Sequence, residues 1–342
     1  MKVVTVETGH PEWNLFVQAS KDATAYHRFG WKAVFTGSFG HPCHYLAAID
    51  DNGEWQGILP LVHMRSRIFG NFLVSLPFVN YGGLLCESEM AGSLLLDAAD
   101  RIRRSCRATY VELRHVAKRL DDLPTKQHKV SMILELRHSS EVQWKAFDPK
   151  LRNQVRKAQK SGLTFRRGQL ELIDDFYEVF ARNMRDLGTP VYPKKFFSNV
   201  MEAFPDTTTI AAVFHEGQIV AAGLASWFKG KLEVPWASSV KDHKALCPNH
   251  MLYWELIRFA IERGFKAFDF GRSTPNEGTY NFKKQWGALP LQLNWQYLMD
   301  ERGRLPELSP DNPKYRLAIS AWRRLPVAIT KILGPLIVRN IP

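Results

Sequence analysis

The sequence predicts a mixed α/β fold made of two similar units. The 342 residues are 45% hydrophobic and 12% aromatic, which is enough apolar material for one large core or for two cores of ordinary size. Runs that alternate with the period of a strand are interleaved with runs that have the period of a helix. The order of these runs also recurs, because one constant offset places Ala47 on Ala211 and Gly53 on Gly217.

Each half contains the same order of expected elements, ending with a helix that crosses back to a further strand. In the first half, two strands, a helix and a strand are expected at 44–50, 57–64, 89–106 and 109–113. In the second half, three strands, a helix and a strand are expected at 207–214, 219–228, 231–240, 249–264 and 266–270. We expect Asn249 to cap the second helix and Gly264 to end it. The alternative is that two unrelated α/β domains share a generic order.

The charge and the cysteines narrow the classes of partner and site. Lys and Arg outnumber Asp and Glu by 46 to 34, a net charge of +12, which favours polyanions such as nucleic acid, phosphorylated lipid or an anionic membrane face. The four cysteines have no CxxC spacing and no histidine at ligand spacing, so we predict neither a disulfide framework nor a metal site. The N-terminal stretch lacks the apolar core of a signal peptide, and we expect a cytoplasmic protein.

A basic segment lies between the two halves. Residues 148–168 carry seven basic residues and no acid after Asp148. Helical spacing places Arg152 and Arg156 on one line and Asn153 on the neighbouring line. Like charges in such a line repel, so folding alone does not explain them. Two interpretations stay open, namely a solvated linker helix and a cradle for phosphate groups of a substrate.

The stretch 268–287 is the strongest candidate for a functional loop. Its first residues alternate like a buried strand that ends at Gly271, so Arg272 and Ser273 follow the carboxyl end of a strand, where α/β folds often bind ligands. Asp269 either lies in the core or faces the site. A carboxylate beside Arg272 can orient that side chain or accept a proton from an amine, and both roles stay open.

Two further segments are candidate acceptor pockets. In residues 76–86, Asn80 and Tyr81 offer polar contacts and Gly82 allows close approach of the backbone; the alternative is a bulged strand or a tight turn. The second segment is residues 188–197, in which Tyr192 is a candidate acceptor contact. Arg185 lies just before this segment and can pair with a carboxylate of the substrate.

Several of these segments together resemble a known family. They are "LRNQVRKAQKSG", "GTPVYPKKFF", "PNHMLYWELIRFAIERGFKAFDFGRS" and "GTYNFKKQWGA". This series is similar to the FemAB (FemABX) family of peptidoglycan aminoacyltransferases and related acyltransferases. With its C-terminal segment, the chain most resembles the FemAB-related branch associated with the exosortase system that sorts PEP-CTERM proteins. The resemblance implies two tandem GNAT-like acyltransferase units with mixed sheets, at 1–145 and 146–305, followed by a helical tail at 306–342.

The resemblance also implies where catalysis occurs. In family members, the Phe-Lys pair that matches Phe282 and Lys283 lies near the acyl donor, which makes Lys283 the first candidate for stabilising the oxyanion or a donor phosphate. The alternative is an ordinary surface lysine. Acyl transfer to an amine requires no covalent enzyme intermediate. In agreement, the sequence has no G-x-S-x-G elbow and no Ser or Cys with a plausible His and acid. Tyr280 and Ser273 complete the predicted substrate contacts.

The acyl donor stays open between aminoacyl-tRNA and acyl-CoA, each as a co-substrate rather than a bound cofactor. Many CoA-dependent GNAT enzymes bind the pyrophosphate with a glycine-rich turn that opens the main helix. The stretch "DHKALCPNHML" has neither glycine, and Pro248 lacks an N–H, which weakens acyl-CoA. The helical arm that some tRNA-using members insert is not evident either, which weakens tRNA.

Taken together, these patterns predict an acyltransferase that forms an amide on a cell-envelope, peptidoglycan-like or exopolysaccharide precursor. The predicted acceptor is anionic or phosphorylated and can be lipid-linked. Two alternatives are an acyl-CoA-dependent N-acetyltransferase that acts on an amino sugar or small amine, and a non-catalytic protein that binds polyanionic glycolipid in an export system. The sequence makes no prediction about oligomeric state.

The tail from residue 312 to residue 342 is apolar but interrupted by charges. Its longest uncharged run is seven residues, far below the roughly 20 that span a bilayer. One interpretation is an interfacial helix, kinked at Pro326 and Pro335, that rests on anionic lipid at the inner membrane face. The competing interpretation is a helix packed on the protein's own surface.

Overall fold

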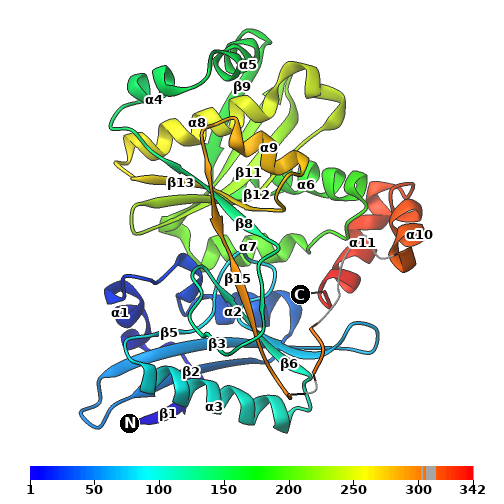
Figure 1. Ribbon diagram of the computed structural model, residues 1–342. Coiled ribbons are helices and arrows are strands. Elements are labelled where there is room, and N and C mark those ends of the chain that lie inside the picture. Colours follow the sequence, from blue (N-terminus) through cyan, green and yellow to red (C-terminus); the bar gives the residue numbers. More distant parts are fainter. Residues whose placement is uncertain (302, 306–312, 342) are drawn as a thin grey trace. The chain divides into compact units, whose positions relative to one another are not determined.

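The computed structural model describes residues 1–301, 303–305 and 313–341, and it shows two compact units (Figure 1). Unit 1 contains residues 1–128 with the described residues of 292–305 and 339–341, and unit 2 contains residues 129–291 and 313–338. The first part of the predicted tail, residues 306–312, lies outside the described residues, as do residues 302 and 342.

Unit 1 is built on a mixed sheet. Its helices are α1 (Pro11–Ala19), α2 (Trp31–Phe39) and α3 (Glu89–Ser105). Its strands are β1 (Lys2–Thr5), β2 (Cys43–Ile49), β3 (Trp55–Ser66), β4 (Gly70–Val74), β5 (Leu85–Cys86), β6 (Tyr110–His115), β7 (Thr125–Lys126) and β15 (Asn294–Met299). The sheet order is β1-β2-β3-β4-β6-β15-β7, with β5 on β3. The pair β4 and β6 is parallel because α3 crosses between these strands.

Unit 2 repeats this plan with more helices. The helices are α4 (Ser140–Ala146), α5 (Pro149–Lys160), α6 (Ile173–Leu187), α7 (Lys194–Ala203), α8 (Pro248–Glu262), α9 (Gly278–Lys284), α10 (Pro313–Trp322) and α11 (Val327–Val338). The strands are β8 (Val130–Glu135), β9 (Leu163–Gly168), β10 (Thr208–His215), β11 (Gln218–Phe228), β12 (Lys231–Ser239), β13 (Ala267–Ser273) and β14 (Leu289–Gln292). The sheet order is β14-β8-β13-β12-β11-β10-β9, and β12 pairs with β13 in parallel.

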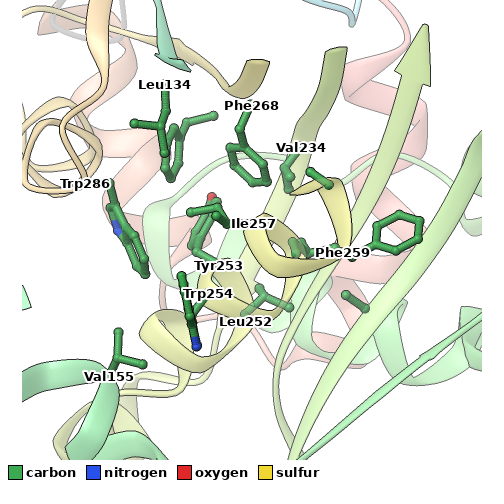
Figure 2. Packing of buried hydrophobic residues seen from close by; sticks show 14 of the residues in the cluster. Leu134, Val155, Val234, Leu252, Tyr253, Trp254, Ile257, Phe259, Phe268 and Trp286 are labelled. Carbon is green, nitrogen blue, oxygen red and sulfur yellow. The ribbon is translucent and has the colours of Figure 1, made fainter. Parts of the chain in front are cut away.

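The core of unit 2 lies between its sheet and α8. Leu252 and Ile257 of α8 are fully buried, and they belong to one cluster with Leu134, Phe268 and Trp286 (Figure 2). The apolar period of α8 therefore serves the core, as its sequence predicts. The helix begins after Cys247 without a side-chain cap, so the predicted capping role of Asn249 is wrong, whereas Gly264 follows the helix with a φ of +72° as expected.

The predicted mixed α/β class with a repeated unit is confirmed. In unit 1 the order is β2, β3, β4, the short β5, α3 and β6; in unit 2 it is β10, β11, β12, α8 and β13. In both, an antiparallel set of three strands leads through a helix to a parallel neighbour of the third strand.

One strand from each predicted unit belongs to the sheet of the other: β8 to that of unit 2 and β15 to that of unit 1. The boundaries of the units therefore differ from those predicted at residues 145 and 305. Strand β8 belongs to the second sheet because it pairs with β13, although it lies within the predicted first unit. Strand β15 pairs with β6 of the first sheet. The neighbouring strands β14 and β15, which only Leu293 separates, therefore belong to different sheets. The alternation of apolar and polar residues along a strand does not indicate which of the two sheets that strand joins.

Candidate active site

The pairing of the parallel strands in unit 2 stops part-way along them. The register joins Lys231 to Ala267, Leu232 to Phe268 and Glu233 to Asp269, and β13 then continues against β8 alone. Just beyond this point, Gly271 has a φ of +75° and lies within a register shift between β13 and β8. Only glycine adopts this conformation without strain, so it makes a bulge that turns backbone groups out of the regular ladder.

Lys283 of α9 reaches these turned-out groups. Its Nζ donates hydrogen bonds to the carbonyl oxygens of Gly271, at 2.9 Å, and of Arg272, at 3.0 Å. An ammonium has three N–H donors, so one is left for a further acceptor. The Lys283 side chain is only 8% exposed. The surface-lysine alternative for this residue does not fit such burial.

Burial also changes the protonation of Lys283. Removal from water lowers the pKa of Lys283 to about 8; the carboxylates of Asp269 and Glu233 act in the opposite direction, and the charge of Arg272 lowers it further. The ammonium is therefore present near neutral pH but is lost at much lower cost than in water. The charges of Asp269, Glu233 and Arg272 thus all act on the protonation of Lys283.

Asp269 holds the bulge. Its fully buried carboxylate accepts hydrogen bonds from Ser131 Oγ at 2.6 Å and from the N–H of Gly271 at 2.8 Å. Its second oxygen lies 3.4 Å from Lys231 Nζ. Because these donors occupy the carboxylate, the geometry favours a positioning role over proton transfer from a substrate amine. Ser273, at the end of β13, is buried.

Aromatic rings surround the first turn of α8 and the middle of α9. The ring of Phe282 lies 5.4 Å from those of His250 and Tyr253, and the ring of Trp286 lies 6.0 Å from that of His250. Burial lowers the pKa of His250 to about 4, so its imidazole is neutral near pH 7. The sequence gives no signal for His250, because one histidine near a helix start has no characteristic spacing. Tyr280 packs against the same core.

The basic segment forms α5, which is amphipathic. Leu151, Val155 and Ala158 are buried, and Asn153 and Arg156 are exposed. The guanidinium of Arg156 donates to Asn153 Oδ1 at 3.3 Å and lies 5.5 Å from the ring of Trp144. Arg152 is half-buried on the same helix. The helix therefore fits both interpretations, because its basic face is solvated and is also available to an anionic ligand.

The candidate residues near the end of α6 have partners within unit 2. Arg185 Nε donates to Asp186 Oδ1 at 2.7 Å, and its Nη1 donates to the carbonyl oxygen of Leu325 at 3.0 Å. This side chain fastens the tail, which leaves less reason to assign it to a substrate carboxylate. Tyr192 lies within an aromatic cluster, and its ring centroid is 5.4 Å from that of Phe196.

In unit 1, residues 75–84 occupy the corresponding break between parallel strands. The pairing of β4 with β6 ends at Val74 and Glu112, and the following residues are buried without interruption. The N–H of Gly82 donates to the carbonyl of Arg114 at 3.0 Å. Asn80 and Tyr81 are buried within this segment. In unit 1, residues 75–84 therefore occupy the position beyond the end of the parallel pairing, which the Lys283 side chain occupies in unit 2.

We expect Gly83→Ala to destabilise unit 1 strongly. Gly83 has a φ of +98°, and an added Cβ would lie 2.4 Å from Cδ2 of His115, whose ring also accepts a hydrogen bond from the N–H of Leu84. Gly53→Ala is the matched control, since Gly53 has a φ of +87° but nothing within 4 Å of a Cβ. Left-handed strain costs about 1–2 kcal/mol in both variants. Urea unfolding should show a clearly larger loss for Gly83→Ala, and equal losses would contradict the close packing.

The second unit matches a known family of domains. Residues 146–284 match the family described as acetyltransferase (GNAT) domain. The match covers 139 of the 342 residues. The matched region includes α5, the β12–β13 pair and Lys283, but neither Ser131 of β8 nor Trp286.

Curated relatives of this chain include enzymes named as glycyltransferases. Lipid II:glycine glycyltransferase of Staphylococcus haemolyticus is 27% identical over 139 residues, which are 39% of this chain and 31% of the relative. The enzyme of the same name from Staphylococcus epidermidis is 25% identical over 134 residues, 37% of this chain and 30% of the relative. The chain thus spans about a third of the length of these relatives. They support the resemblance to FemAB-like acyltransferases.

Solved structures share the fold along nearly the whole chain. The crystal structure of FemX covers 92% of this chain and 100% of its own, with a TM-score of 0.69 and 16% identity. A tandem GNAT protein from the clavulanic acid biosynthesis pathway covers 89% of this chain and 99% of its own, with a TM-score of 0.53 and 10% identity. Two GNAT-like units in tandem are therefore the architecture of this chain.

Neither a membrane-spanning helix nor a metal-binding cluster occurs in the described residues. No helix in this part of the chain combines the length and the apolar character that crossing a bilayer requires. In the same residues, no three His, Cys, Asp or Glu side chains are grouped in a way that could hold a metal ion.

Proposed function

We propose that the protein transfers an aminoacyl group from aminoacyl-tRNA to an amine of a lipid-linked, peptidoglycan-like precursor. Lys283 carries the proposal, since it is a buried ammonium at the break in the β12–β13 pairing with one N–H donor to spare. The names of the curated relatives supply the reaction class, a glycyl transfer to lipid II. The proposed location is cytoplasmic, at the inner membrane face.

In the proposed reaction, the acceptor amine attacks the ester carbonyl of the donor. The carbonyl oxygen becomes an oxyanion, and the remaining N–H of Lys283 donates to it, which is worth most in a site shielded from water. The C–N bond forms as the C–O bond to the terminal ribose breaks, and the amine proton passes to the departing hydroxyl. Asp269 and the Gly271 bulge hold Lys283 in place, because the bulge presents both carbonyls to its Nζ.

The first turn of α8 supports tRNA over acyl-CoA. A pyrophosphate at a helix start is normally bound by free backbone N–H groups. Here Pro248 has none, and the N–H groups of His250 and Met251 donate to the carbonyl of Cys247, at 3.0 and 3.4 Å. This turn therefore offers few donors to a pyrophosphate. The exposed basic side chains of α5 offer an alternative contact for a polyanionic donor.

The test is a comparison of donors with purified full-length protein. Labelled glycyl-tRNA and labelled acetyl-CoA are each offered with lipid II as acceptor, and transfer of label to the acceptor is measured by thin-layer chromatography. We expect transfer from glycyl-tRNA only, with donor retention that falls steeply as salt rises. Transfer from acetyl-CoA only would contradict the proposed donor. Transfer from neither donor to lipid II would contradict the proposed acceptor, alone or together with the proposed donor.

A second candidate is an N-acetyltransferase that uses acyl-CoA on an amino sugar or small amine. The description of the matching domain as an acetyltransferase favours it. The acetyl-CoA arm of the same experiment, repeated with glucosamine, separates the two. The finer proposal, a role beside the exosortase and exopolysaccharide systems, predicts that genes of those systems lie beside this one.

A further inference from the structure

Helix α11 packs on unit 2 with its small and polar side chains. Thr330, Gly334 and Val338 are buried, and Lys331 forms an ion pair with Glu178 of α6. A Cβ on Gly334 would lie 2.8 Å from the backbone nitrogen of Val191, so the helix sits tightly on its support. Figure 1 shows α11 beside α6, which are in contact.

The opposite face of α11 is apolar and exposed. Ile329 and Leu333 are 41% exposed, Leu336 is 61% exposed and Ile332 is 70% exposed. Their spacing places them on a single stripe of the helix. A helix that merely covers its own domain buries such a stripe and exposes its polar side, which is the reverse of what is seen. The helix therefore packs on the protein's own surface, as the competing interpretation of the tail expects, but its apolar stripe takes no part in that packing.

The charge of the segment indicates what covers this stripe. Residues 313–342 contain six basic residues and no acidic residue. Arg323 and Arg324 are exposed in the connection between α10 and α11, which ends at Pro326 just before α11 begins. Arg323 Nη2 also donates to the carbonyl oxygen of Leu187 at 3.1 Å. Two copies of the chain that met at this stripe would bring like charges together. An anionic lipid surface instead satisfies both the apolar stripe and the arginines.

We infer that the α11 stripe, defined as Ile329, Ile332, Leu333 and Leu336, inserts into the interfacial region of an anionic membrane, with Arg323 and Arg324 contacting lipid headgroups. This docking is independent of the acyl donor and acceptor. It holds unit 2 at the membrane through a helix that lies in the plane of the interface and does not cross it.

The experiment is sedimentation of the full-length protein with vesicles. One set is phosphatidylcholine alone, and the other is phosphatidylcholine and phosphatidylglycerol in equal parts. We expect binding to the anionic set that weakens with salt. The double variant Ile332→Ser/Leu336→Ser should bind at least about tenfold more weakly, because two apolar side chains no longer leave water. Arg324→Gln should weaken binding about fivefold.

A matched control separates this stripe from general surface hydrophobicity. Leu15 and Ile68 of unit 1 are 66% and 82% exposed, so Leu15→Ser/Ile68→Ser removes similar apolar area elsewhere. The control should bind anionic vesicles like the natural chain. Equal binding by both double variants, or no binding of the natural chain to anionic vesicles, would overturn the inference. So would a dimer in sedimentation velocity that Ile332→Ser/Leu336→Ser abolishes, because a second copy would then cover the stripe.

Discussion

Lys283→Met is expected to lower kcat by about 10²- to 10³-fold, the usual loss when a positioned oxyanion donor is removed. The methionine fills the same narrow space, so the α9 packing should persist. Lys284→Met is the matched control because Lys284 is the next residue of α9 but is exposed. Initial rates with saturating donor measure the effect. A loss of similar size in both variants would mean that the positive charge of α9 matters and not the buried ammonium.

The pH dependence should identify the same group. Since the pKa of Lys283 is lowered to about 8, the ammonium is present below that pH and kcat should fall as pH rises through it. Lys283→Arg keeps its charge, so its residual rate should lack that fall. The free energy of unfolding should change with pH in the opposite direction to kcat. In the unfolded chain Lys283 keeps its proton up to about pH 10.5, whereas in the folded chain it loses the proton near pH 8. The stability of the natural chain relative to Lys283→Met should therefore rise between pH 8 and 10.5. A pH profile unchanged by Lys283→Arg would contradict this assignment.

Arg114→Met is expected to lower the free energy of unfolding by about 3–5 kcal/mol, because it leaves a buried carboxylate without its partner. Arg114 and Glu112 are both buried, with 2.7 Å between Arg114 Nε and Glu112 Oε1. Tyr297 donates to the other oxygen of Glu112 at 3.0 Å, and burial, followed by the negative charge of Glu112, raises the pKa of Tyr297. The guanidinium also lies 4.3 Å from the ring of Trp295.

Two comparisons make that stability prediction specific. Arg104→Met removes an exposed arginine from its ion pair with Asp100 and should cost less than about 1 kcal/mol. The double variant Glu112→Leu/Arg114→Met should recover most of the loss, since no unpaired charge remains. Urea unfolding followed by tryptophan fluorescence measures all of them. If Arg114→Met were no worse than Arg104→Met, the buried pair would not stabilise unit 1.

The repeated order of elements could be predicted because it depends on local signals. Turn glycines such as Gly53 and Gly217, alternating strands and the apolar face of α8 each act within a few residues. The exchange of β8 and β15 could not be predicted in this way. Both strands have ordinary alternation, and which sheet each completes depends on partners far away in the sequence.

The candidate site shows the same limit. Lys283 could be singled out through its resemblance to a family pair, but its burial depends on a bulge that needs a positive φ at Gly271. The partner that fixes Asp269 is Ser131, which lies more than a hundred residues earlier and on the exchanged strand. Likewise, the arrangement of α11, polar side inward, follows from close contact at Gly334 and not from its hydrophobic pattern.

The strand exchange has a consequence for synthesis on the ribosome. The edge of β6 stays unpaired on one side until residues 294–299 have emerged, because only β15 covers it in that register. Unit 1, although it is translated first, is therefore completed late, and its nascent form exposes a strand edge for most of translation. A fragment cut at the limits of the matched domain would lack β8 and leave the β13 edge open in the same way.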